Sequence, residues 1–173
     1  MSSPYLPNTL GILQAIVALA QTASFTLTGG ATSFTLVQGG GIKDLTDILP
    51  AMTVEGASDS SKRGGSGGTQ VGWRVEEPLQ FRLTLYADYT NSTNGEIDIV
   101  TMRDAVVALF QQCIKLGNIA LGGQLAAPAN VIDSHVLEHS GRYFFREITG
   151  TTYRGYMVTL EVTQQYSVTI AAG

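Results

Sequence analysis

The segment His135-Val136-Leu137-Glu138-His139 holds the residue types best suited to chemistry in this 173-residue chain. Its spacing matches H-x-x-E-H, the inverted zinc-protease motif, in which two histidines bind Zn²⁺ and a glutamate acts as general base. That arrangement requires a helix, whereas this segment follows a strand pattern that ends at a Ser140-Gly141 turn. On a strand, Glu138 points away from both histidines. We therefore interpret His135 and His139 as solvated or interface side chains. A zinc-dependent hydrolase using His135, Glu138 and His139 is kept as the remote alternative.

A stretch rich in glycine and serine, residues 56–69, resembles a phosphate-cradling loop in composition. It lacks the Lys-Ser/Thr ending of a P-loop, and no helical pattern follows it. We predict a flexible loop with Lys62 and Arg63 at its centre, which a partner orders on binding. The two cations suit contact with an acidic partner or a phosphate backbone, without sequence specificity.

Cys113 is the one cysteine of the chain, so an intrachain disulfide and a cysteine zinc cluster are both excluded. It lies on an apolar helical stripe with no histidine nearby in sequence, which favours a buried small hydrophobe over a nucleophile. No nucleophile elbow or pair of carboxylates stands out. The sequence therefore predicts no catalytic residue, no cofactor and no metal, the weak histidine motif aside.

Charged residues make up 14% of the chain, against about 25% in a typical soluble domain. None occurs before Lys43 and none between Gly117 and Asn130. The net charge of −4 disfavours specific nucleic-acid recognition. A surface poor in charge suits burial against neighbouring subunits. We predict that residues 2–42 and 117–130 form subunit contacts.

The uncharged N-terminal region also raises the question of a membrane segment. Its apolar core, residues 10–20, is shorter than the roughly 20 residues that a bilayer-spanning helix needs. No Lys or Arg precedes it, so the basic region of a secretory signal is missing. We expect a buried helix here and no membrane partner.

Hydrophobic periodicity predicts which elements position these residues. Spacings of three and four predict helices over 9–20 and 96–116, the second with a stripe that includes Leu109. Alternation predicts strands over 51–55, 79–89, 131–137, 143–148 and from Tyr156 onward, with Gln164 as the one break in the apolar face of the last strand.

A repeated unit, Ser24-Phe25-Thr26-Leu27 and Ser33-Phe34-Thr35-Leu36, predicts a β-hairpin inserted over residues 24–38. Phe25 and Phe34 of this hairpin are candidate interface residues. The whole order predicts one α+β domain over residues 1–173: a mainly antiparallel sheet with two helices on one face, plus the extra hairpin.

Four pieces of the chain together resemble a known protein family. They are the helix over 9–20, the strand Leu79-Gln80-Phe81-Arg82-Leu83-Thr84-Leu85-Tyr86, the helix over 96–116 and the strand Gly155-Tyr156-Met157-Val158-Thr159-Leu160-Glu161-Val162. In order and pattern they resemble the tail terminator, or head-to-tail joining, proteins of long-tailed bacteriophages. The hairpin and the loop over 56–69 depart from the small members of that family and leave open another neck, tail, baseplate or capsid accessory protein.

The resemblance implies a structural, non-enzymatic virion protein of the tail or neck, assembled in the host cytoplasm. It implies a homo-oligomeric, hexameric ring that stops growth of the tail tube and joins the tail to the head connector. The implied partners are therefore further copies of the chain, the tail tube protein and the head-tail connector protein. Lys62 and Arg63 would then project into the lumen or onto a neighbouring ring, where non-specific contact with DNA is open.

Overall fold

The computed structural model describes residues 8–42, 44–45, 47–56, 64–69, 72–88, 92–137 and 141–168. Within these residues the chain forms two α-helices, one short 3₁₀ helix and a seven-stranded sheet. In chain order the elements are α1 (Thr9–Ala20), β1 (Leu36–Gly39), β2 (Ala51–Gly56), β3 (Gly64–Thr69), β4 (Gly72–Asp88), α2 (Ser92–Gln112), η1 (Ile119–Leu121), β5 (Val131–Val136), β6 (Arg142–Ile148) and β7 (Thr151–Val168).

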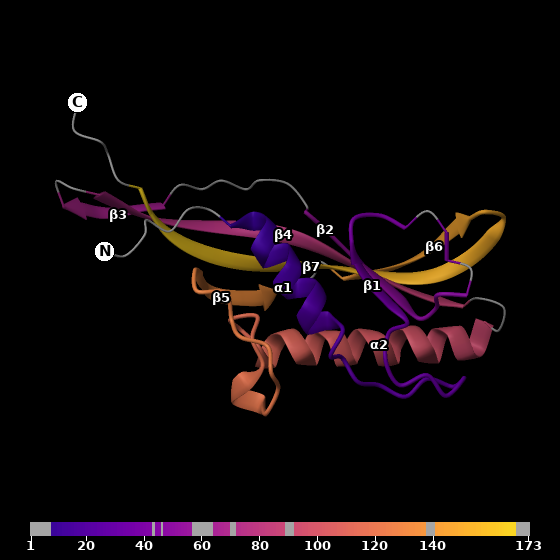
Figure 1. Cartoon of the computed structure of the whole chain (residues 1–173). Coiled ribbons are helices and arrows are strands. Elements are labelled where there is room, and N and C mark those ends of the chain that lie inside the picture. The colour runs from indigo at the N-terminus through magenta and orange to yellow at the C-terminus, as the bar shows by residue number, and fades with distance from the viewer. Residues whose placement is uncertain are drawn as a thin grey trace.

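Two long antiparallel strands, β4 and β7, form the centre of the sheet (Figure 1). Their register runs from Trp73 opposite Val168 to Asp88 opposite Tyr153. The short strands β2 and β3 follow one another along the outer edge of β4, and β5 and β6 do the same along β7. β1 lies outside β2 and runs parallel to it, so this pair departs from the antiparallel pattern. The predicted α+β class is confirmed.

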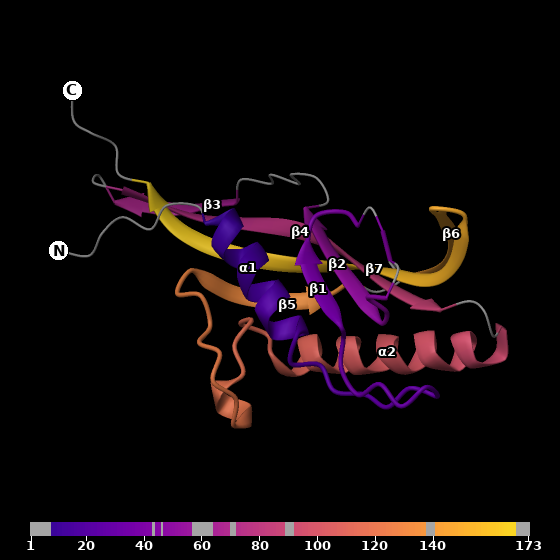
Figure 2. The same cartoon turned by 45° about the vertical axis from the view of Figure 1, so that its right-hand side comes forward.

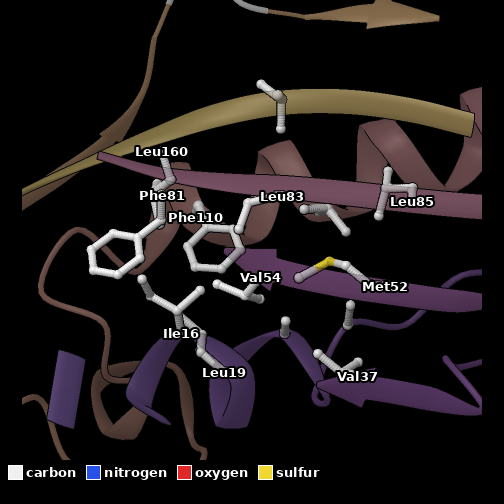
Figure 3. Packing of buried hydrophobic residues seen from close by; sticks show 14 of the residues in the cluster. Ile16, Leu19, Val37, Met52, Val54, Phe81, Leu83, Leu85, Phe110 and Leu160 are labelled. Carbon is white, nitrogen blue, oxygen red and sulfur yellow. The ribbon is translucent and has the colours of Figure 1, made fainter. Parts of the chain in front are cut away.

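Alternation along β4 decides which face of the sheet meets the helices. Its odd-numbered apolar residues, such as Phe81 and Leu83, are buried in one cluster with Ile16 of α1 and Phe110 of α2 (Figure 3). α1 packs against β1 and β2, while α2 packs against β4, β5 and β7. The prediction of two helices on one face is therefore confirmed.

The first helix begins and ends where the sequence predicts. Asn8 caps it, because its Oδ1 accepts a hydrogen bond of 3.0 Å from the backbone N–H of Gly11. Its residues Ile12, Ile16 and Leu19 are fully buried. Burial of each such side chain contributes roughly 1.5–3 kcal/mol, which anchors an uncharged helix that gains nothing from surface ion pairs.

The second helix runs four residues ahead of its predicted bounds at each end, over Ser92–Gln112. After its last residue, the chain turns at Leu116, which takes the left-handed conformation with φ 61°. Gly117 is needed for a steric reason: a Cβ there would lie 2.5 Å from the backbone nitrogen of Ala127. Phe110 is fully buried on the core stripe, where the sequence indicated Leu109.

Residues 24–38 do not form the predicted two-stranded hairpin. The backbone N–H of Phe25 donates to Thr32 at 3.1 Å and that of Leu27 to Ala31 at 2.9 Å, but no strand pairing extends from this turn. Instead, Leu36–Gly39 becomes β1 and pairs with β2, starting opposite Ala51. The repeat predicted that its two halves pair with each other. Instead, the backbone hydrogen bonds of the end of the second half are made with β2, further along the chain.

Residues 64–69 are also not the predicted flexible loop. They form β3, with Gly64 opposite Glu76 and Thr69 opposite Gly72 of β4. β4 accordingly starts at Gly72, earlier than the predicted 79, because its first part pairs with both β3 and β7. Gly56 ends β2, and residues 57–63 lie outside the described residues.

A second apolar cluster covers one end of the sheet face opposite the helices. Tyr86 and Tyr153 are buried there beneath Ile42 and Leu45, from the segment between β1 and β2. Figure 2 shows this segment passing over the sheet on the side away from α2. The two sheet faces are therefore buried to different extents, and the helix face carries the main core.

Neither helix within the described ranges combines the length and the hydropathy that crossing a bilayer requires.

Candidate subunit interface

His135 lies near the end of β5, on a strand as expected, and its side chain is 51% exposed. Its Nδ1 is 3.2 Å from Oδ2 of Asp133, and its Nε2 is 3.9 Å from Oε1 of Glu161. Glu138 and His139 lie outside the described residues. Within the part of the chain that the structure describes, no group of three His, Cys, Asp or Glu side chains could hold a metal ion.

The predicted contact residues fall in three different settings. Lys62 and Arg63 lie outside the described residues. Phe25 is 7% exposed and belongs to the main core, where its ring meets that of Phe34 edge-on at 4.9 Å. Phe34 is half-buried against the same cluster. Phe25 therefore supports the fold of its loop from inside and offers little free surface.

Cys113 is 2% exposed and follows the last turn of α2. Burial raises the pKa of its thiol, so the thiolate that a nucleophile needs is disfavoured. Its position on the buried stripe is as predicted.

Several large apolar side chains face solvent, in the segment after α2, on β6 and near the start of each α-helix. Ile114, Ile119 and Leu121 are 49%, 60% and 56% exposed and follow its C-terminal end. Tyr143 and Phe145 on β6 are 48% and 56% exposed. Ile97 in the first turns of α2 and Leu10 of α1 complete the set among the described residues. Isolated exposed apolar residues are common, but groups of them mark contact surfaces.

Residues 117–130, here named the apolar loop, carry Ile119 and Leu121 on a short 3₁₀ turn. Both cartoon views show this loop projecting from the end of α2, away from the sheet (Figures 1 and 2). Asn118 holds its shape: its Oδ1 accepts from the N–H of Leu125 at 2.9 Å, and its backbone C=O accepts from Gly123 at 2.9 Å. The apolar tip is thus presented on a hydrogen-bonded frame.

An open groove of about 530 Å³ lies between α2 and the junction of β5 with β6. Its lining mixes apolar and polar surface in similar amounts. We name it the α2 groove by the lining residues Val107, Ala108, Val136, Leu137, Tyr156 and Val158, with Arg103, Asp104, Gln111 and Gly141 beside them. The groove therefore combines an apolar floor with a few polar groups, as binding sites do.

Charge in the α2 groove is balanced locally. The guanidinium of Arg103 lies 2.6 Å from Oδ1 of Asp104, and this hydrogen bond raises the pKa of Arg103. Arg103 also hydrogen-bonds the hydroxyl of Tyr143 and lies 5.9 Å from the ring centroids of Tyr143 and Tyr156. Burial raises the pKa of Tyr156, which keeps its hydroxyl protonated at neutral pH. A ligand entering the groove meets no unpaired charge from this pair.

The chain was compared with protein families, curated proteins and solved structures. No protein-family model and no curated protein matches the chain. Among solved structures, a chain of "Virion of native gene transfer agent (GTA) particle" is similar over 86% of this chain and 84% of that chain, with 12% sequence identity and a TM-score of 0.35. At those values the function has to be argued from the surface of this chain.

Leu10 and the apolar loop lie within the two stretches that the absence of charge marked as contacts, and their role in contacts stays a prediction. Tyr143 and Phe145 were missed, because the sequence treated residues 143–148 as an ordinary strand. The signal that could have found them is the placing of aromatic residues at alternate positions of an edge strand, because one face of such a strand can remain exposed to solvent.

Proposed function

We propose that this chain is a structural virion protein that acts like a phage tail terminator, forming a closed ring at the head-proximal end of the tail tube. In this role the chain makes and breaks no covalent bond. The observation that carries the proposal is that one chain with few charges presents both an uncharged, projecting apolar loop and an open groove with an apolar floor. Such surfaces favour association of subunits over the monomeric state in solution.

The ring accounts for the uneven charge of the chain. Every subunit of a ring buries two flanks against neighbours, and the stacked faces meet the tube on one side and the connector on the other. Segments without charge are favoured there because a buried, unpaired charge costs free energy. The solved structure reported above also belongs to a virion, although the proposal rests on the surface of this chain.

Electron microscopy tests the role on virus particles purified from cells that produce the chain with a small C-terminal tag, which a gold label detects. We expect label at the junction between tail and head. Label at the distal tip of the tail or over the capsid shell would reject the terminator role and support a tail-tip or capsid accessory protein. No label on any particle would reject the virion assignment altogether.

A further inference from the structure

We infer that the apolar loop of one copy docks into the α2 groove of a second copy, in a head-to-tail contact. The inference deepens the proposed function and rests on it, because it names the contact that builds the ring. The two surfaces differ from one another, so each copy that uses its loop still has a vacant groove. Contacts of this type repeat until the ring closes.

The loop fits the groove in its polarity. Residues 117–130 carry no charged side chain, and the tip residues Ile119 and Leu121 are aliphatic. The groove floor is aliphatic and aromatic, with Val107 and Val158 on facing elements. Burial of apolar surface on both partners then drives the contact, at roughly 25 cal/mol per Å² of area removed from water.

The charges agree with this occupant. The α2 groove holds one cation and one anion, Arg103 and Asp104, which already pair with each other. A charged peptide would leave a charge unmatched in the groove, whereas an uncharged loop leaves none. Arg103 keeps donor capacity beyond its bonds with Asp104 and Tyr143, because a guanidinium carries five N–H donors. The backbone carbonyls of a loop rich in glycine and alanine can accept from it.

The dimensions also agree. At about 530 Å³ the groove lies within the range of pockets that enclose small molecules, so two aliphatic side chains fit inside. Ile119 and Leu121 do not line the groove of their own chain and remain 60% and 56% exposed. The Asn118 hydrogen bonds fix the loop in this projecting form before it meets a partner, which lowers the ordering cost of binding.

Two single substitutions test the contact, one in the loop and one in the groove. Leu121→Asp places a charge on the loop tip, and Ala108→Arg fills the groove from an exposed position of α2 where arginine is a good helix former. We expect each to weaken self-association by on the order of 30-fold or more, measured by mass photometry over a dilution series. The matched control is Gln112→Arg, an exposed residue near the end of the same helix that does not line the groove. Unchanged circular dichroism melting shows that the variants fold.

Mixing the two defective variants tests the head-to-tail arrangement itself. The Leu121→Asp chain keeps its groove and the Ala108→Arg chain keeps its loop, so the mixture should form heterodimers that cannot extend. A mixture that stays monomeric would overturn the pairing of loop with groove. Wild-type rings with both variants assembling normally would overturn this inference and leave the proposed ring standing. A wild-type chain that is monomeric at every concentration would overturn both.

Discussion

Gln164 explains why the apolar alternation of the last strand breaks at one position. Its side chain is fully buried. Its Oε1 accepts from the backbone N–H of Asn8 at 3.1 Å and from Nδ2 of Asn130 at 2.9 Å, and its Nε2 donates to Glu77 at 2.9 Å. One amide thus ties the start of α1 to β4 and to the segment before β5.

Replacing Gln164 should therefore destabilise the fold. In Gln164→Leu, the amide of Asn130 and the N–H of Asn8 lose their acceptor, which should lower the free energy of unfolding by roughly 1–3 kcal/mol. Urea denaturation measures this loss. The matched control is Gln165→Leu, on the opposite face of β7 and bonded to Glu76 at an exposed site, with an expected change within about 0.5 kcal/mol. Equal losses in the two variants would show that the network contributes nothing.

Cys113 and Tyr156 predict how stability depends on alkaline pH. Burial raises the pKa of both groups in the folded chain. An acid whose folded pKa is raised holds its proton more tightly when folded, so its contribution is complete below the unfolded pKa and is lost as the pH rises through the folded one. The midpoint of urea unfolding should thus fall as the pH rises from about 8 to about 11.

Tyr156→Phe provides the control for this effect, since it keeps the ring and removes the titrating hydroxyl. We expect the decline between pH 9 and 11 to be shallower in this variant than in the wild-type chain. A steeper decline, or an identical one, would show that Tyr156 does not contribute to the pH dependence.

Within the sheet, Gly155 illustrates how one strand admits an aromatic side chain from its neighbour. The ring of Phe144 lies over Gly155, where an added Cβ would come within 2.2 Å of it, and meets Tyr86 edge-on with 6.0 Å between centroids. The missing side chain on β7 therefore lets β6 and β4 pack through their aromatic residues, an arrangement that also compensates for a glycine in a strand.

Gly155→Ala should displace Phe144 and cost roughly 1–3 kcal/mol of stability, as overpacking does in a well-packed core. Gly56→Ala at the end of β2 is the control, because nothing lies within 4 Å of a Cβ there and its φ is not in the left-handed region. Thermal unfolding of both variants measures the difference. A melting temperature for Gly155→Ala equal to that of Gly56→Ala would refute this account of the packing.

Elements defined by their own periodicity were predictable from sequence. α1 was predicted to the residue, and the alternation of β4 and β7 identified the face that meets the helices. Elements defined by a distant partner were not. Glycine and serine disfavour strands, so β3 forms through pairing with β4, and β1 pairs with β2 instead of its neighbour in the repeat.

The candidate interface divides in the same way. The apolar loop was visible as a stretch without charge, because composition alone marks it. The α2 groove was not visible, because Ala108 on α2 and Val136 on β5 become neighbours through the packing of α2 on the sheet. The groove could therefore be found only from the fold, whereas the loop proposed to fill it could be found from the sequence.

For the whole molecule, the proposed contact predicts that assembly tolerates salt. An interface made by aliphatic residues and an internally paired Arg103–Asp104 has little long-range electrostatic energy to screen. Raising NaCl from about 0.05 M to about 0.5 M, across which the Debye length falls severalfold, should leave the assembled mass unchanged. Dissociation on adding salt would instead indicate contacts between unpaired charges.

The central claim is that copies of this chain close into a ring, and the mass of the wild-type particle tests it most directly. Mass photometry of the purified chain at micromolar concentration should show one dominant species at an integer multiple of 18.4 kDa, six for the ring that the family resemblance implies. A single species of 18.4 kDa at every concentration, or an open ladder of masses with no preferred size, would contradict the account.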